Sequence, residues 1–185
     1  MNKHGYTLLE ILVAIGAVAI VGSLIAQVFF TTTRTNTKSE IQKEVKQNGD
    51  YAVEIMERMI RNSLGVTSTC TSGGTTLSTI EIKNSDGQDT QFGCVFDSGV
   101  SRIASTSATT GGSVFLTGTN VTTGGTSCAD TSNPTNPMTL QFVCTSNVDS
   151  PPSVQIQFTL SQAVQSPDQT NTATLKFQTT VSPRN

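Results

Sequence analysis

Residues 8–30 read LLEILVAIGAVAIVGSLIAQVFF, and this stretch decides how the chain is organised. Only Glu10, Ser23 and Gln27 interrupt its apolar or small residues. A helix of this length rises about 35 Å, which is enough to cross a hydrocarbon core of about 30 Å. A secretory signal has a shorter apolar region followed by a small-residue cleavage site, and no convincing site of that kind follows here. The pattern therefore predicts a membrane-spanning helix.

Glu10 is the residue that a plain single-pass anchor leaves unexplained. A carboxylate inside an apolar span costs roughly 2.5–3.5 kcal/mol on insertion scales, so it is rarely found there without a partner. The preceding residues are Lys3, His4 and Gly5, followed by Tyr6 and then Thr-Leu-Leu. Something outside the span is expected to neutralise the carboxylate.

The run KHGYTLLEILVAI, residues 3–15, resembles the N-terminus of the type IV prepilin family. That family has a short basic leader ending in Gly, then an aromatic residue, a Thr, an apolar pair and a Glu. The resemblance implies that a prepilin peptidase removes leader residues 1–5 by cutting between Gly5 and Tyr6, and that the new amine of Tyr6 is N-methylated. It also implies a partner for Glu10, the amine of Tyr6 on a neighbouring subunit, so that one charge pair fixes axial register.

The same resemblance implies a location and a set of partners. The transmembrane helix, residues 6–30, would cross the inner (cytoplasmic) membrane once, with the rest of the chain outside the cytoplasm, and would later form the core of a pilus or pseudopilus. The assembled protein would lie at the cell surface or in the periplasm. Charge counting alone does not orient the span, because Lys3 lies on one side and Arg34 and Lys38 on the other. The expected partners are the peptidase, other pilin or pseudopilin subunits and membrane lipid.

Residues 31–65 predict an amphipathic helix after a Thr-rich joint, Thr31 to Thr33. Its apolar residues recur at steps of three and four, which is the helical period. They are Ile41, Val45, Ala52, Ile55, Met56, Met59, Ile60 and Leu64. Gly65 is expected to cap the C-terminal end. If this helix continues the membrane span, about 60 residues give a rod of roughly 90 Å.

Two further segments resemble the larger minor pilins and the J-type minor pseudopilins of type II secretion. QNGDYAVEIMERMIRNSLG, residues 47–65, is similar to their Met- or Leu-rich helix carrying Arg, and FQTTVSPRN, residues 177–185, is similar to their final strand ending in Arg-Asn. The resemblance implies a low-abundance subunit that initiates or caps a filament.

Residues 66–185 predict a β-rich exported domain, so the fold class is α+β: a pilin-like long helix packed on an antiparallel sheet. Short alternating apolar runs are separated by turn signals rich in Gly, Pro, Asn and Asp. The expected strands are Leu77–Lys83, Thr90–Phe96, Met138–Cys144, Val154–Leu160 and Ala173–Val181. The expected turns include Ser85–Gly87, Gly111–Gly112, Gly124–Gly125, Asn133–Pro134 and Pro151–Pro152. The Thr/Ser-rich stretches 105–112 and 117–127 are predicted to be exposed loops.

Four cysteines, Cys70, Cys94, Cys128 and Cys144, all follow the apolar segment, where an exported domain meets an oxidising compartment. This distribution favours disulfides over metal or redox roles. Four cysteines allow three pairings, and the sequential one, Cys70 with Cys94 and Cys128 with Cys144, is the expected pairing.

The chemistry-bearing residues favour a protein that is not an enzyme. The single histidine, His4, lies in the expected leader, and no C-x-x-C pair occurs, so we expect no catalytic residues, no cofactor and no metal. The formal charge of -2 gives no general attraction to DNA, although Lys83, Arg102 and Lys176 are possible phosphate contacts. Asp130, Asp149 and Asp168 match no spaced calcium loop. The alternatives are a membrane-anchored adhesin or DNA-capture module that does not polymerise and, further behind, a tethered hydrolase.

Overall fold

The computed structural model describes residues 7–124, 128, 140–147, 150–163 and 173–184. Their elements are α1 (Leu8–Arg61), β1 (Gly65–Val66), β2 (Thr75–Leu77), β3 (Ile80–Lys83), β4 (Asp89–Asp97), β5 (Val100–Ser107), β6 (Ser113–Phe115), β7 (Val121–Thr122), β8 (Leu140–Asn147), β9 (Ser150–Gln162) and β10 (Thr174–Val181). The chain forms two compact units, residues 1–40 and 41–185. We call the second unit the head.

Within the head, α1 buries one narrow stripe. Val45, Ala52, Met56 and Ile60 are at most 1% exposed, and their spacings of seven, four and four residues keep them on one face. Ile41, Ile55 and Met59 are partly buried beside them. The predicted apolar face is therefore confirmed, except that Leu64, beyond the end of the helix, is 61% exposed.

The helix ends earlier than expected. It stops at Arg61, and Gly65 belongs to strand β1 instead of capping the helix. The buried hydroxyl of Ser63 donates to the carbonyl of Ile60 at 2.7 Å, which satisfies an orphan carbonyl of the last turn. The N–H of Leu64 then donates to the carbonyl of Lys83 at 2.8 Å, and this contact turns the chain into the sheet.

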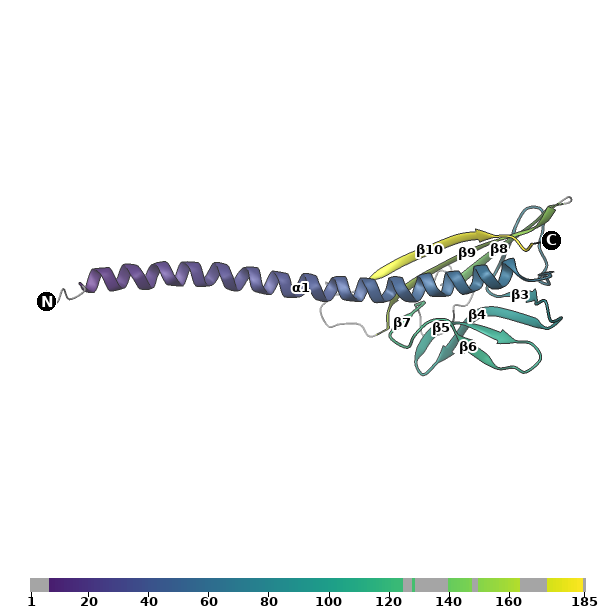
Figure 1. Ribbon diagram of the computed structural model, residues 1–185, viewed down its shortest axis with the longest axis horizontal. Coiled ribbons are helices and arrows are strands. Elements are labelled where there is room, and N and C mark those ends of the chain that lie inside the picture. The colour runs from purple at the N-terminus through teal and green to yellow at the C-terminus, as the bar shows by residue number, and fades with distance from the viewer. Residues whose placement is uncertain (1–6, 125–127, 129–139, 148–149, 164–172, 185) are drawn as a thin grey trace. The chain divides into compact units, whose positions relative to one another are not determined.

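The strands form two antiparallel sheets rather than the one expected sheet. Sheet A has the order β1-β3-β4-β5-β6, and sheet B has the order β10-β9-β8-β2, with β7 also paired to β9. In Figure 1, β10 of sheet B is drawn on one side of the C-terminal part of α1, and β4, β5 and β6 of sheet A are drawn on the other. The coarse prediction of a long N-terminal helix packed on antiparallel strands is confirmed.

One predicted strand is divided between the two sheets. The run Leu77–Lys83 was expected to be one continuous strand, but Ser78 and Thr79 do not belong to a strand and separate β2 from β3. β2 pairs with β8 in sheet B, and β3 pairs with β4 in sheet A. A Cβ atom placed on Gly93 of β4 would lie 2.9 Å from the Thr79 methyl group, so the crossing chain passes close to a glycine. The alternation along the run could not reveal this break, since both halves keep the strand period.

The other strand predictions differ mainly in length. β4, β8 and β10 overlap their expected ranges, while β9 extends to both sides of its range and includes Pro151 and Pro152, which were expected to form a turn. A register shift in the β8–β9 pairing lies between Thr145 and Asn147, next to the two prolines. β10 pairs with β9 only from Val154 onward. Prolines are tolerated where the hydrogen-bond ladder is interrupted in this way.

The two predicted Thr/Ser-rich loops are partly ordered strands. β5 contains residues 105–107, and the turns at Ser85–Gly87 and Gly111–Gly112 lie where they were expected. In the stretch 117–124, Thr117, Val121 and Thr123 are at most 2% exposed. The prediction that Thr117–Ser127 is an exposed loop is therefore wrong for residues 117–124, the part of the stretch up to the first gap in the described residues.

The β4–β5 hairpin closes with a two-residue turn that the sequence analysis did not single out. Ser98 and Gly99 have φ values of 51° and 83°. Two-residue hairpin loops favour such left-handed residues because the turn then matches the twist of the strands. This hairpin fixes the register in which Val95 lies opposite Arg102.

Candidate functional site

The N-terminal end of α1 is capped by Thr7. The Thr7 hydroxyl accepts a hydrogen bond from the backbone N–H of Glu10 at 3.3 Å, and the Thr7 carbonyl accepts the N–H of Ile11 at 3.2 Å. Thr at the N-cap with Glu three residues later is the pattern called a capping box. The predicted cleavage and methylation positions, Gly5 and Tyr6, lie outside the described residues.

Glu10 lies in the first turn of α1 and is exposed. A carboxylate is favoured at this end of a helix, because the unsatisfied N–H groups there carry partial positive charge. Sequence reasoning missed this local contribution, although the signal T-x-x-E from Thr7 to Glu10 was present. The presence of a carboxylate at position 10 is therefore partly explained by its stabilising effect on the first turn of its own helix.

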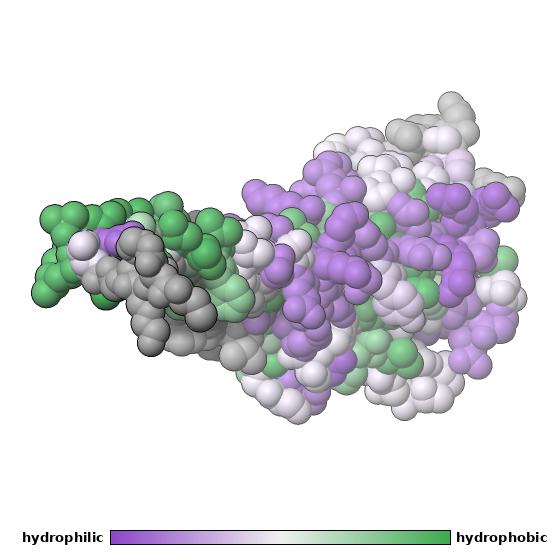
Figure 2. Space-filling view, turned by 60° about the vertical axis from the view of Figure 1, so that its left-hand side comes forward, coloured by the Kyte–Doolittle hydropathy of each residue, from purple (hydrophilic) through white to green (hydrophobic). Residues whose placement is uncertain are grey.

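The side chains that follow Glu10 form an exposed apolar surface (Figure 2), and the helix is long and apolar enough to cross a membrane. Fourteen large apolar side chains between residues 8 and 30 are each at least 51% exposed. The hydroxyl of Ser23 donates to the carbonyl of Ile20 at 2.8 Å, so this polar group is satisfied within the helix. A surface of this kind needs lipid or protein to cover it.

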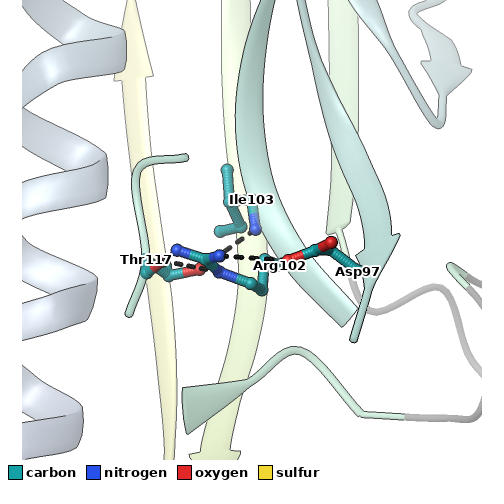
Figure 3. A network of polar contacts seen from close by, with 4 residues as sticks. All are labelled: Asp97, Arg102, Ile103 and Thr117. Carbon is teal, nitrogen blue, oxygen red and sulfur yellow. Dashed lines mark hydrogen bonds and ion pairs between the residues drawn. The ribbon is translucent and has the colours of Figure 1, made fainter. Parts of the chain in front are cut away.

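In the head, Arg102 of β5 is the centre of a polar network (Figure 3). Its Nε and one Nη donate to the carbonyl of Thr117 at 2.9 and 2.6 Å, and the other Nη lies 3.5 Å from a carboxylate oxygen of Asp97. The guanidinium carbon is 3.8 Å from the centroid of the Phe115 ring. The Arg102 side chain is only 12% exposed, whereas Asp97 is 42% exposed. The network joins the β4–β5 hairpin to the segment that follows β6.

The opposite side of that segment is fixed to α1. The side-chain oxygen of Asn48 accepts the N–H of Gly118 at 2.8 Å, and its amide nitrogen donates to the carbonyl of Glu44 at 3.0 Å. The Asn120 amide also donates to the Glu44 carboxylate. We call residues 116–120 the clasp, because it is held by Arg102 from one side and by Asn48 from the other. Sequence reasoning found neither the clasp nor Asn48, since a lone polar residue on an amphipathic helix gives no signal.

The disulfides are Cys70–Cys144 and Cys94–Cys128, so the sequential pairing was wrong. Pairing between strands determines which cysteine lies close enough to Cys144 to form a disulfide with it. Cys144 lies opposite Thr75 in the sheet, and a bridge between Thr71 and Thr145 places Cys70 beside it.

The second disulfide follows from the segment after β7. The N–H of Thr123 donates to the carbonyl of Ser101 at 3.0 Å, and its hydroxyl lies 3.5 Å from the sulfur of Cys94. Thr123, five residues before Cys128, therefore lies beside Cys94.

The possible phosphate contacts do not form one patch of free cations. Arg102 is engaged in the network described above, while Lys83 on β3 and Lys176 on β10 are exposed on different sheets. Asp130, Asp149 and Asp168 lie outside the described residues. Within the described part of the chain, no three His, Cys, Asp or Glu side chains are grouped so as to hold a metal ion.

No protein-family model, curated protein or solved structure matches this chain. The described residues provide an exposed apolar helix with one carboxylate near its start, and a disulfide-bonded head that buries its own core. This arrangement suits insertion into an apolar surrounding and association through the apolar helix.

Proposed function

We propose that the chain is a structural subunit of a type IV pilus or of a type II secretion pseudopilus. The observation that carries the proposal is Glu10, the one carboxylate in the exposed apolar stretch 8–30. The motif KHGYTLLEILVAI, of which Glu10 is a part, adds support, because it supplies both the leader and the residue whose freed amine pairs with Glu10. The resemblance of segments 47–65 and 177–185 to minor subunits supports a low-abundance subunit that initiates or caps the filament.

The physical mechanism is selection of register. In an apolar surrounding, an unpaired carboxylate and an unpaired ammonium group are both costly. Docking a subunit so that its Glu10 meets the amine of Tyr6 on a neighbour satisfies both groups at once. Other staggers leave both groups unpaired, so one charge pair fixes the axial offset of the apolar helices.

The Thr7 cap gives a specific reason to keep a second candidate function. If Glu10 serves only to close a capping box, a single-pass anchor has sufficient use for it. The head would then belong to a membrane-anchored adhesin or DNA-capture module that never polymerises. The two functions differ in whether the charge of Glu10 is needed.

Glu10→Gln separates the two functions. Glutamine is the other residue found at this position of a capping box, so the variant keeps the cap and loses the charge. We expect the unaltered chain to be recovered in sheared filaments, and Glu10→Gln and Glu10→Ala to be inserted and processed but absent from them. A chain that never polymerises would be absent from filaments in its unaltered form as well. Glu40→Gln is the matched control, since Glu40 is an exposed carboxylate of the same helix outside the apolar stretch. Normal incorporation of Glu10→Gln would refute the charge-pair mechanism.

Processing provides the second test. Intact mass and N-terminal sequencing should give a chain that begins at N-methylated Tyr6, and this species should be lost in cells without prepilin peptidase. A chain that still begins at Met1, or one cut near Phe30 in both strains, would leave an anchored or secreted β-rich protein. The filament function would then have to be abandoned.

A further inference from the structure

Asn48 and Gly49 form the one Asn-Gly pair in the chain, since every other asparagine that has a following residue precedes Lys, Thr, Ser, Val or Pro. In this dipeptide the main-chain nitrogen of the glycine readily attacks the side-chain carbonyl of the asparagine, because glycine has no side chain in the way and a permissive backbone. The usual result is spontaneous loss of the asparagine amide. The pair lies in the part of α1 that packs in the head.

The folded head keeps this pair unreactive. The amide nitrogen of Asn48 donates to the carbonyl of Glu44 at 3.0 Å, and its side-chain oxygen accepts the N–H of Gly118 at 2.8 Å. Gly49 lies inside the continuous helix, where each main-chain N–H is directed along the axis at the carbonyl four residues earlier. The attacking nitrogen and the carbonyl carbon are therefore held apart.

Neither member of the pair can be exchanged without losing a contact. Gly49 is buried, and a Cβ atom placed on it would overlap the ring of Phe177. Asn48 supplies a donor and an acceptor from one side chain, which a carboxylate cannot do because it only accepts. The head thus depends on a dipeptide that is chemically stable only while it is helical.

We propose that Asn48 is a site of spontaneous deamidation that is unreactive in the folded head and reactive once the head unfolds. The nitrogen of Gly49 forms a bond to the side-chain carbonyl carbon of Asn48, the bond from that carbon to the amide nitrogen breaks, and ammonia leaves with the proton of the Gly49 N–H. Water then opens the cyclic imide at one of its two carbonyls. One opening gives aspartate and the other gives isoaspartate, so water is the only co-reactant.

Both products prevent the head from regaining its original contacts. Aspartate keeps the acceptor for the Gly118 N–H, but it has no donor for the carbonyl of Glu44. It also stands four residues from the Glu44 carboxylate, a like-charged spacing that destabilises a helix. Isoaspartate carries the main chain through the side-chain carbon, so it adds an atom to the backbone and breaks the helical hydrogen-bond pattern. The site therefore converts a reversible unfolding of the head into a permanent loss of stability where α1 meets the clasp.

Peptide mapping by mass spectrometry on the full chain in detergent tests the reaction. Samples are held in mildly alkaline buffer, with and without enough urea to unfold the head, with the disulfides intact. In the unfolded chain Asn48 should deamidate faster than Asn62 and Asn84, both of which precede serine. In the folded chain the reaction at Asn48 should be on the order of 100-fold slower, because it has to pass through the open state. Equal rates at Asn48 in the two samples, or a rate in urea no higher than at Asn62 and Asn84, would overturn the proposal.

Asn48→Asp reproduces one product and measures its effect. The variant should lower the Tm of the head by roughly 3–7 °C, because it loses one hydrogen bond and adds like-charge repulsion. Asn36→Asp is the matched control, since Asn36 is an exposed residue of the same helix outside the head, and it should leave that Tm unchanged. An unchanged Tm for Asn48→Asp would contradict the permanent loss of stability. These measurements need no filament, so failure of Glu10 to direct assembly would leave the proposal standing.

Discussion

Gly49→Ala should destabilise the head even though alanine is the better helix former. Gly49 lies on the buried stripe of α1, and a Cβ atom placed on it would overlap the outer edge of the Phe177 ring of β10. Real Cβ atoms do not approach other atoms so closely, so the ring or the helix has to move. The glycine is therefore required by the close approach of helix and strand.

The ring has little room to yield. Phe177 stacks on Phe158 of β9, with ring centroids 5.0 Å apart and an interplanar angle of 18°. Overpacking a filled core costs about 1–3 kcal/mol, while replacing Gly by Ala in a helix contributes up to about 1 kcal/mol in the other direction. The net loss should be about 1–2 kcal/mol. For a head of this size that lowers Tm by roughly 3–7 °C.

Calorimetry of the full chain in detergent, following the unfolding of the head, measures this effect. Phe177→Leu provides the control background, because a smaller side chain leaves space for the new methyl group. In that background Gly49→Ala should be neutral or stabilising. A rise in Tm when Gly49→Ala is made in the natural sequence would show that the helix and β10 are not in close contact.

Three other predictions follow from the same contacts. Thr7→Val removes the N-cap hydroxyl and should cost about 1 kcal/mol of helix stability, seen as faster amide exchange in the first turn, whereas Thr7→Ser should keep the protection. Arg102→Lys cannot reproduce the paired donation to one carbonyl together with stacking on a ring, and we expect a loss of about 1.5–3 kcal/mol in thermal unfolding; an unchanged Tm would mean that the clasp is held by other contacts. Peptide mapping without reduction should recover Cys70–Cys144 and Cys94–Cys128, which are 74 and 34 residues apart. In the chain-entropy estimate, losing the first should cost about 4.5 kcal/mol and losing the second about 3.8 kcal/mol, so the reverse order would contradict that account.

Local patterns predicted the parts of the fold that local physics decides. The apolar stripe of α1 could be read from its spacing, because only one face of that helix contacts the head core. The strand β9 could also be predicted from its alternating sequence, since Val154, Ile156, Phe158 and Leu160 are buried while the residues between them are not. Glu10 was found in the same way, as a charge inside an apolar run.

Apart from the Thr7–Glu10 cap and the bond from the Ser63 hydroxyl to the Ile60 carbonyl, the features that were missed depend on partners far away in the sequence. The division of Leu77–Lys83 between two sheets is decided by pairing with β8 and β4, and the disulfides depend on that same pairing. The helix was extended to Gly65 because Gly is a common C-cap, yet a serine hydroxyl and a contact with Lys83 end it first. The network around Arg102 joins β5 to Thr117, fifteen residues away. The apolar pattern within a single helix or strand does not record such contacts.

The exposed apolar stretch should keep the protein in a membrane after heat has unfolded the head. Fourteen large apolar side chains lie uncovered between residues 8 and 30, and burying each is worth about 1.5–3 kcal/mol. Inserting them into a membrane would therefore contribute roughly 20–40 kcal/mol, well above the 5–15 kcal/mol that typically stabilises a folded domain. Heating should unfold the head while the chain stays in the membrane, so the protein should remain in the carbonate-resistant pellet above the Tm of the head. Release into the supernatant at that Tm would mean that the head, and not residues 8–30, holds the protein at the membrane.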